Sequence, residues 1–245
     1  GSEMCIRDRF STWDYTTMYL IEGEDKAVLI DTGTRCADLD KIVGQITGKP
    51  LEVIVTHMHP DHAGCIKYFD KVWMHRADTV LVPQHAADYQ GEFLYMEEGQ
   101  VFDLGGRKLE VAWMPGHTPG SVVLLDKANG DCYSGDAFGS GEVWLQCVPM
   151  SPIATFHESC CRMEKLMKEG HIKDIWCGHY PYLKSSLPLA YIQTMIRISH
   201  RLMNGDQEGS EPYSNYFIKM PPTARKLAEG RAMIVYDSTN IPEAR

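Results

Sequence analysis

The chain carries its densest set of metal-seeking side chains at positions 57–62, which hold His57, His59, Asp61 and His62. Neutral imidazole and carboxylate are the ligands that first-row divalent metals prefer. This motif directly follows the short, β-branched run at 51–55, which is typical of a buried strand. The sequence therefore predicts a metal site where a strand ends, held rigidly on one side and open on the other.

Three later segments each add one further candidate ligand beside glycine or proline. They place His117 in a Gly/Pro-rich loop, Asp136 after a predicted strand and His179 after a third apolar run. A single histidine beside a strand is usually structural, but these groups all stand in the same strand-end context. Together with the first motif they supply five histidines and two aspartates. That set is enough for two metals and too large for one tetrahedral site.

The motifs resemble those of the metallo-β-lactamase superfamily of hydrolases, and within it the glyoxalase II and lactonase branch. The resemblance spans roughly residues 15–185 and rests on five motifs: DTG at 31–33, HxHxDH at 57–62, GHTPG at 116–120, SGD at 134–136 and GHY at 178–180. It implies one metal held by His57, His59 and His117, and a second held by Asp61, His62 and His179. Asp136 would then bridge the two metals, and Asp31 would orient the ligand loops from behind.

The resemblance also implies a reaction. Two divalent ions, Zn²⁺ before Fe or Mn, would bind a bridging hydroxide that attacks a small ester, thioester or lactone. Asp61 is the candidate catalytic residue, since a carboxylate at this place can move a proton to the leaving group. Oxygen reductases of the superfamily carry Glu where this chain has His59, which disfavours redox chemistry. The best-known β-lactamases of this fold carry Cys or no ligand where it has Asp136, which disfavours antibiotic hydrolysis.

Two other functions stay open at this point. A phosphodiesterase or nuclease of the same fold is compatible with the ligand set. A non-catalytic metal-binding scaffold is less favoured, because the chain keeps every ligand of the resemblance.

Composition limits the partners. The formal net charge of −9 argues against a nucleic-acid surface, which needs clustered Lys and Arg. No apolar run approaches the ~18 residues of a membrane span. The eight cysteines lack the spacing of a disulfide framework, which favours a reducing compartment. We therefore expect a small-molecule substrate, a cytoplasmic location and no membrane contact, with a homodimer as a possibility.

The order of predicted elements indicates an α+β protein, and the resemblance implies an αββα sandwich. We expect a single domain over residues 10–245, with a core at about 15–185 and a C-terminal helical elaboration at 186–245. Within that elaboration the patterns predict helices at 187–203 and 222–228 and a strand at 232–236. Residues 1–9 are predicted to be a tag remnant or disordered.

Two segments are candidate walls of a substrate pocket. Residues 84–100 are long and aromatic, with Tyr89 and Phe93, and residues 137–152 carry Phe138 and Trp144 just after Asp136. His157 is a further candidate, because it lies between Asp136 and His179 in the chain.

Overall fold

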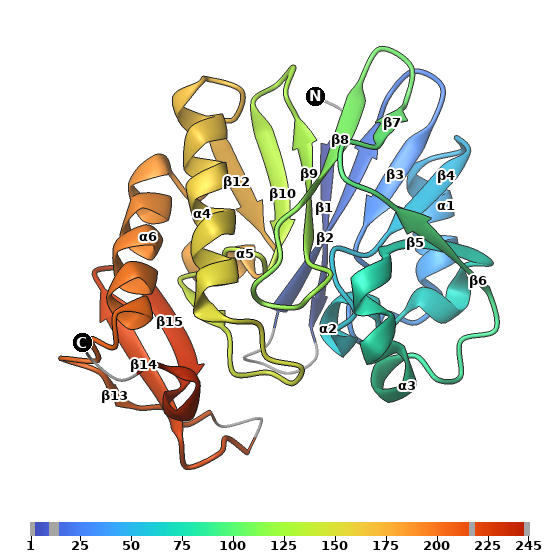
Figure 1. The fold of residues 1–245 in the computed structure, drawn as a ribbon. Coiled ribbons are helices and arrows are strands. Elements are labelled where there is room, and N and C mark those ends of the chain that lie inside the picture. The colour runs from blue at the N-terminus through green and yellow to red at the C-terminus, as the bar shows by residue number, and fades with distance from the viewer. Residues whose placement is uncertain (1–2, 10–14, 216–218, 243–245) are drawn as a thin grey trace.

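Two β-sheets form the centre of the molecule in a computed structural model that describes residues 3–9, 15–215 and 219–242 (Figure 1). The first sheet has the order β1-β2-β3-β4-β5-β6. Its strands are β1 (Glu3–Arg9), β2 (Tyr15–Glu22), β3 (Ala27–Ile30), β4 (Leu51–Ile54), β5 (Lys71–His75) and β6 (Glu92–Met96). The second sheet has the order β12-β10-β9-β8-β7. Its strands are β7 (Val101–Asp103), β8 (Lys108–Trp113), β9 (Val122–Asp126), β10 (Asp131–Gly135) and β12 (Asp174–Cys177).

Helices cover both outer faces of this pair of sheets. In Figure 1, α4 and α6 lie on one side of the sheets and α1 and α3 on the other. The α-helices are α1 (Leu39–Ile46), α2 (Pro60–Ala63), α3 (Val82–His85), α4 (Ile153–Lys168), α5 (Tyr180–Leu183) and α6 (Leu189–Met203). Short 3₁₀ turns are η1 (Ile66–Tyr68), η2 (Arg76–Leu81) and η3 (Ser238–Asn240). The predicted αββα sandwich is confirmed.

The central strands are apolar because both of their faces are buried. Along β3, Val28 and Ile30 pack into the core between the sheets, whereas Leu29 packs under the outer helices. In β9, Leu124 faces the inter-sheet core and Val123 faces the layer of α4 and α6. Successive side chains of a strand point to opposite faces, so a strand covered on both sides needs an unbroken apolar run. Each such buried side chain contributes about 1.5–3 kcal/mol.

Strand direction brings the candidate ligand loops to one edge of the sandwich. β3 and β4 run parallel, and so do β10 and β12, so the loops that leave each pair emerge together. Main-chain hydrogen bonds join the sheets at this edge. Val122 N–H donates to the Thr56 carbonyl over 3.0 Å, and Thr17 N–H donates to the Gly178 carbonyl over 2.6 Å. The loops after β4 and β12 therefore lie next to the first residues of β9 and β2, although these segments are far apart in the sequence.

The N-terminal segment differs from its prediction. Residues 3–9 form β1, which pairs antiparallel with β2 from Glu3 opposite Ile21 to Arg9 opposite Tyr15. The expected disorder of residues 1–9 is therefore wrong for this strand, while residues 1–2 lie outside the described part of the chain. The edge of β2 presents main-chain N–H and C=O groups, and an added strand satisfies them.

The C-terminal elaboration is half sheet. The helix predicted at 187–203 is confirmed by α6, and the strand predicted at 232–236 by β15 (Ala232–Asp237). The short helix predicted at 222–228 is wrong, because β14 (Ala224–Glu229) pairs along its whole length with β15. The three-residue spacing of buried Ala224 and Leu227 imitates a helical pattern, but the neighbouring strand decides the outcome.

A third sheet results from this pairing. It has the order β11-β15-β14-β13, with β11 (Glu142–Trp144) supplied by the segment after Asp136 and β13 (Glu211–Pro212) at the far edge. Ile234 and Tyr236 of β15 join the same apolar cluster as α4 and α6, so the elaboration packs on the core. Within the described residues, no helix is long and apolar enough to cross a membrane.

Candidate metal centre

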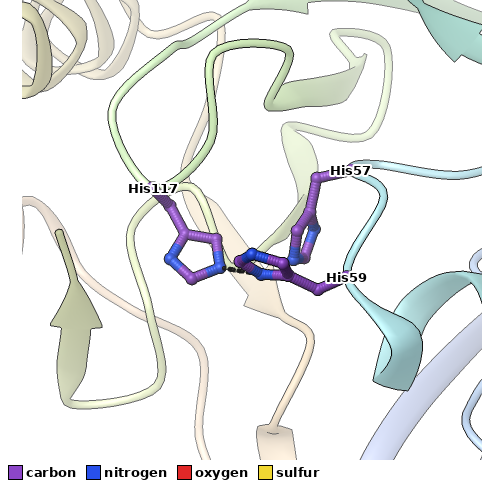
Figure 2. A group of neighbouring side chains, drawn as sticks. All are labelled: His57, His59 and His117. Carbon is purple, nitrogen blue, oxygen red and sulfur yellow. Dashed lines mark hydrogen bonds between the residues drawn. The ribbon is translucent and has the colours of Figure 1, made fainter. Parts of the chain in front are cut away.

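Three histidines converge from the two sheets. His57 and His59 lie on the loop that leaves β4, and His117 lies on the loop that enters β9 (Figure 2). Figure 2 shows their rings turned toward one another, and His59 Nδ1 lies 2.9 Å from His117 Nε2. One ring nitrogen from each of the three lies within 4.8 Å of the others. Three nitrogens at such separations match the spacing of ligands around one ion, since Zn–N bonds measure about 2.0–2.1 Å.

A second group lies beside the first. Asp61 and His62 belong to α2, Asp136 follows β10, and His179 follows β12. His179 Nε2 lies 3.2 Å from Asp136 Oδ2 and 3.3 Å from Asp61 Oδ2. His62 Nε2 lies 3.5 Å from Asp136 Oδ1. One ligand atom from each of the four residues again lies within 4.8 Å of the others.

Asp136 connects the two groups. Its Oδ2 lies 3.2 Å from His179 Nε2 in the second group and 4.0 Å from His117 Nε2 in the first. The structure therefore brings all seven predicted ligands together, with Asp136 in the intermediate position.

Hydrogen bonds behind the rings fix which nitrogen faces the interior. Thr56 Oγ1 donates to Asp31 Oδ2 and so accepts the bond from His57 Nδ1, 3.1 Å away. His62 Nδ1 donates to Asp31 Oδ2 over 2.7 Å, and His117 Nδ1 donates to the Trp144 carbonyl over 2.8 Å. These bonds occupy the Nδ1 atoms of His57, His62 and His117, so their Nε2 atoms face the interior, as is usual for metal-binding histidines.

Asp31 holds its predicted position behind the ligands. It is 1% exposed, and besides the His62 bond it accepts from the main-chain N–H of Thr56 over 2.7 Å. Its φ of 65° lies in the left-handed region, which is uncommon for a residue other than glycine. The network of bonds around its carboxylate compensates for that backbone conformation and ties the β3 and β4 loops together.

A second buried carboxylate, Asp78 of η2, was missed by sequence reasoning. Its oxygens accept hydrogen bonds from Met58 N–H (3.0 Å), Gly120 N–H (2.6 Å) and the Thr118 hydroxyl (3.0 Å). Met58 stands between His57 and His59, and Thr118 directly follows His117. Asp78 therefore joins the two loops that carry the first ligand group, although it contacts none of the ligands by these bonds.

Close packing at the centre requires glycine at position 178. A Cβ atom there would lie 2.4 Å from His62 Cε1 and 2.7 Å from Asp136 Oδ1. Contacts that short do not occur between such atoms, so any side chain at this position must displace a ligand. The glycine of the GHY motif is thus explained by the approach of β12 to the second group.

Buried polar atoms without partners test whether this site fits metal ions. Among the described residues, His57 Nε2, His62 Nε2 and Asp136 Oδ1 are buried with no hydrogen-bond partner. Buried polar groups are nearly always satisfied, so unpaired ones in a native structure call for a ligand or ion. All three are good metal ligands, and all three face the interior of the centre. The residues present therefore fit a divalent metal site built from imidazole and carboxylate.

The electrostatics of the two groups differ. Burial lowers the pKa of His57 and His117, and it lowers the pKa of His59 to about 3, so these imidazoles are neutral and able to bind metal. Burial also opposes charge on His62 and His179, but the nearby carboxylates, Asp136 above all, outweigh it and raise the pKa of both. The second group therefore stabilises positive charge, which a divalent cation also provides.

The sequence matches the model of the Metallo-beta-lactamase superfamily over residues 11–146. The chain belongs to this superfamily. It is 26% identical over 215 residues to the human "Acyl-coenzyme A thioesterase MBLAC2", which covers 71% of this chain and 77% of that protein. It is 27% identical over 179 residues to a "Hydroxyacylglutathione hydrolase" of Aeromonas salmonicida (strain A449), which covers 71% of this chain and 64% of the relative.

Solved structures of the superfamily share the fold. The metallo-beta-lactamase family protein TTHA1429 from Thermus thermophilus superposes with a TM-score of 0.66 at 18% identity, over 86% of this chain and 84% of the other. The likeness supports the αββα architecture described above.

Four of the predicted pocket residues make other contacts in the structure. Phe138 is 0% exposed in the core under α4 and α6, so it lines no pocket. His157 Nδ1 bonds to Ser199 Oγ on α6, 2.9 Å away, because α4 turns it toward that helix. Tyr89 and Phe93 pack in the layer outside the first sheet, since residues 92–96 of the expected loop form β6.

Trp144 contacts the metal centre through its main chain. Its carbonyl holds His117, while its indole N–H donates to Glu142 and its ring meets Tyr213 edge-on at 6.1 Å. That the indole contacts substrate stays a prediction. A residue not expected there, His85 of α3, places its ring 5.8 Å from that of His59.

Proposed function

We propose that this chain is a metal-dependent hydrolase of acyl thioesters that holds two divalent ions, with Zn²⁺ the first choice and Fe or Mn the alternatives. The observation that carries the proposal is the pair of facing ligand groups with three buried, unpartnered ligand atoms between them. The named relatives support the bond type, since acyl-coenzyme A and hydroxyacylglutathione are both thioesters. Small esters and lactones are the neighbouring substrates to test.

The ligand assignment follows the geometry. His57 Nε2, His59 Nδ1 and His117 Nε2 would hold one ion. Asp61, His62 and His179 would hold the second, and Asp136 would serve both. When bound, such ions supply Lewis acidity that polarises a carbonyl oxygen and acidifies water.

Asp61 is the residue proposed to handle protons. Its side chain is 27% exposed, against 15% for Asp136, so it is the more accessible carboxylate of the second group. The charge of His62 and the hydrogen bond of His179 outweigh burial and hold its pKa below the usual range, so it is a carboxylate at neutral pH. It can accept a proton from water and return it to a departing group.

The leaving group decides how much this proton matters. A thiol ionises near a pKa of about 8.5, so a thiolate departs with little help, whereas an alkoxide needs a proton. We therefore propose that the geometry of the centre, more than acid catalysis by Asp61, carries thioester cleavage.

The remaining expectations are proposals of the same standing. The net charge of −9 disfavours polyanionic nucleic acid and supports a small-molecule substrate. The cytoplasmic location and the homodimer stay predictions.

The test combines metal analysis with a substrate panel: an acyl-coenzyme A, S-lactoylglutathione, a p-nitrophenyl ester, a homoserine lactone, nitrocefin and bis-p-nitrophenyl phosphate. We expect about two ions per chain and the highest kcat/KM on a thioester. Asp136→Ala is the negative control, because it removes the carboxylate proposed to serve both ions and changes no other side chain. Phosphodiester cleavage that exceeds every acyl substrate tenfold, or full activity of a metal-free preparation, would overturn the proposal.

A further inference from the structure

Two cysteines connect the loops that carry Asp31 and His62. The main-chain N–H of Cys36 donates to Cys65 Sγ over 3.0 Å, and neither cysteine is in a disulfide. Cys36 follows Asp31 by five residues, and Cys65 follows His62 by three. The pair therefore joins the segment after Asp31 to the segment after His62, and neither thiol belongs to the ligand groups.

The main chains of the two loops are already in contact. Thr32 N–H donates to the His62 carbonyl over 2.7 Å, and Cys65 N–H donates to Thr32 Oγ1 over 3.2 Å. A Cβ on Gly64 would lie only 2.5 Å from the Thr34 carbonyl oxygen. A bond between the two cysteines therefore needs no large movement of the backbone.

The hydrogen bond also limits the distance between the cysteine Cα atoms. With standard bond lengths, an N···Sγ contact of 3.0 Å allows these atoms a separation of at most about 7 Å. Disulfides span about 4.4–6.8 Å between Cα atoms, so even the largest separation that this contact allows lies close to the long end of the range. The observed contact joins Cys36 N to Cys65 Sγ, so closing the disulfide requires the Cys36 side chain to bring its own Sγ to that sulfur.

A small cavity is lined by both cysteines. Its volume is about 150 Å³, and its walls include Cys36, Cys65, Arg35 and Lys67. Cys36 is half-buried and Cys65 is 1% exposed, so a reagent in the cavity meets Cys36 first. The two cationic side chains at the wall attract anionic reagents.

We propose that Cys36 and Cys65 form a redox site that reacts with small anionic disulfides and closes to an intramolecular disulfide. The Cys36 thiolate attacks one sulfur of the reagent, which releases one thiol and leaves a mixed disulfide on Cys36. The Cys65 thiolate then attacks the Cys36 sulfur and releases the second thiol. The two thiol protons end on the released thiols, and two electrons pass from the protein to the reagent.

The closed form has a defined physical effect. The bond bridges positions 29 apart in sequence and ties the loop of Asp31 to the loop of His62. Cross-linking reduces the conformational entropy of the unfolded chain, so the closed form resists unfolding more than the open form. The proposed reaction of Cys36 and Cys65 does not depend on whether the protein hydrolyses thioesters.

The experiment treats the reduced, full-length protein with glutathione disulfide, blocks remaining thiols with iodoacetamide and maps tryptic peptides by mass spectrometry. Trypsin cleaves after Arg35 and Lys41, so the two cysteines fall on separate peptides that only their bond keeps together. We expect the joined peptides in the wild type. We also expect the oxidised protein to melt at least about 4 °C higher than the reduced one.

Variants report the order of the two steps. In Cys65→Ser, Cys36 should retain one glutathione, because the resolving thiol is gone. In Cys36→Ser, Cys65 should remain a thiol that iodoacetamide alkylates. The difference in melting temperature between the treated and the reduced protein should vanish. Cys161→Ser, which removes an exposed thiol on α4, is the control and should behave as the wild type. Alkylation of both Cys36 and Cys65 in the treated wild type, with glutathione on Cys161 instead, would overturn the proposal.

Discussion

Asp78 gives the sharpest test of how the ligand loops are held. Asp78→Ala removes the acceptor of three hydrogen bonds but leaves every candidate ligand in place. Thr118 retains a second partner, since its hydroxyl lies 2.8 Å from Ser121 Oγ. Met58 N–H and Gly120 N–H are the two donors that lose their partner in a site that is 0% exposed at Asp78.

The magnitude follows from these two donors. Each buried N–H left without a partner costs about 1–3 kcal/mol. Part of that loss is offset, because burial raises the pKa of Asp78 and its ionised form carries a desolvation cost that the alanine removes. We expect the free energy of unfolding to fall by about 3 kcal/mol. Affinity for metal should fall about 10- to 100-fold, as for other groups that support ligands from behind.

The assay is urea unfolding of the metal-free protein, paired with a metal titration of the folded protein. Asp88→Ala is the matched control, because Asp88 is exposed in a neighbouring segment and should change neither quantity. An Asp78→Ala protein with wild-type unfolding energy would refute the reasoning from unpaired donors. A destabilised protein with unchanged metal affinity would confine Asp78 to a role in folding.

Three further substitutions probe the centre itself. Asp136→Ala should lose both ions together, because one carboxylate lies between the two groups; elemental analysis that finds one ion fully retained would contradict this. Asp61→Asn should lower kcat on an alkyl ester at least ~100-fold but spare thioesters relative to alkyl esters; equal losses on both would assign Asp61 to metal binding alone. Gly178→Ala should abolish binding at the second group, since its Cβ would strike His62, whereas Gly44→Ala, with nothing within 4 Å of its Cβ, should bind metal as the wild type does.

The ligands were predictable because their chemistry is local. His57, His59, Asp61 and His62 stand together in one motif, and each remaining ligand follows or precedes a recognisable strand. Parallel strands place their exits at one edge, so the sequence order of strands and loops already implies convergence. The role of Asp31 behind the ligands came from the family resemblance of the DTG motif at 31–33.

Asp78 was not predictable for the opposite reason. It is one of 33 acidic residues, stands in no motif and lies within a 3₁₀ turn after β5. Its three partners are 20, 40 and 42 positions away, so only the folded chain shows what it binds. The orientation of aromatic side chains was not predictable for the same reason. Phe138 and Trp144 are on the expected segment, but packing against α6 and Tyr213 decides where they point.

The ligand groups also explain why this centre needs both sheets. The first group takes two histidines from the β4 loop and one from the β9 loop. The second group takes Asp61 and His62 from α2, which follows β4 of the first sheet. It takes Asp136 and His179 from the loops that follow β10 and β12 of the second sheet. Because neither sheet supplies a complete group alone, any ion bound here binds the docked sandwich and not the separated sheets. Metal binding and the docking of the sheets are therefore linked, and each ion stabilises the folded state in proportion to the logarithm of its concentration over its Kd.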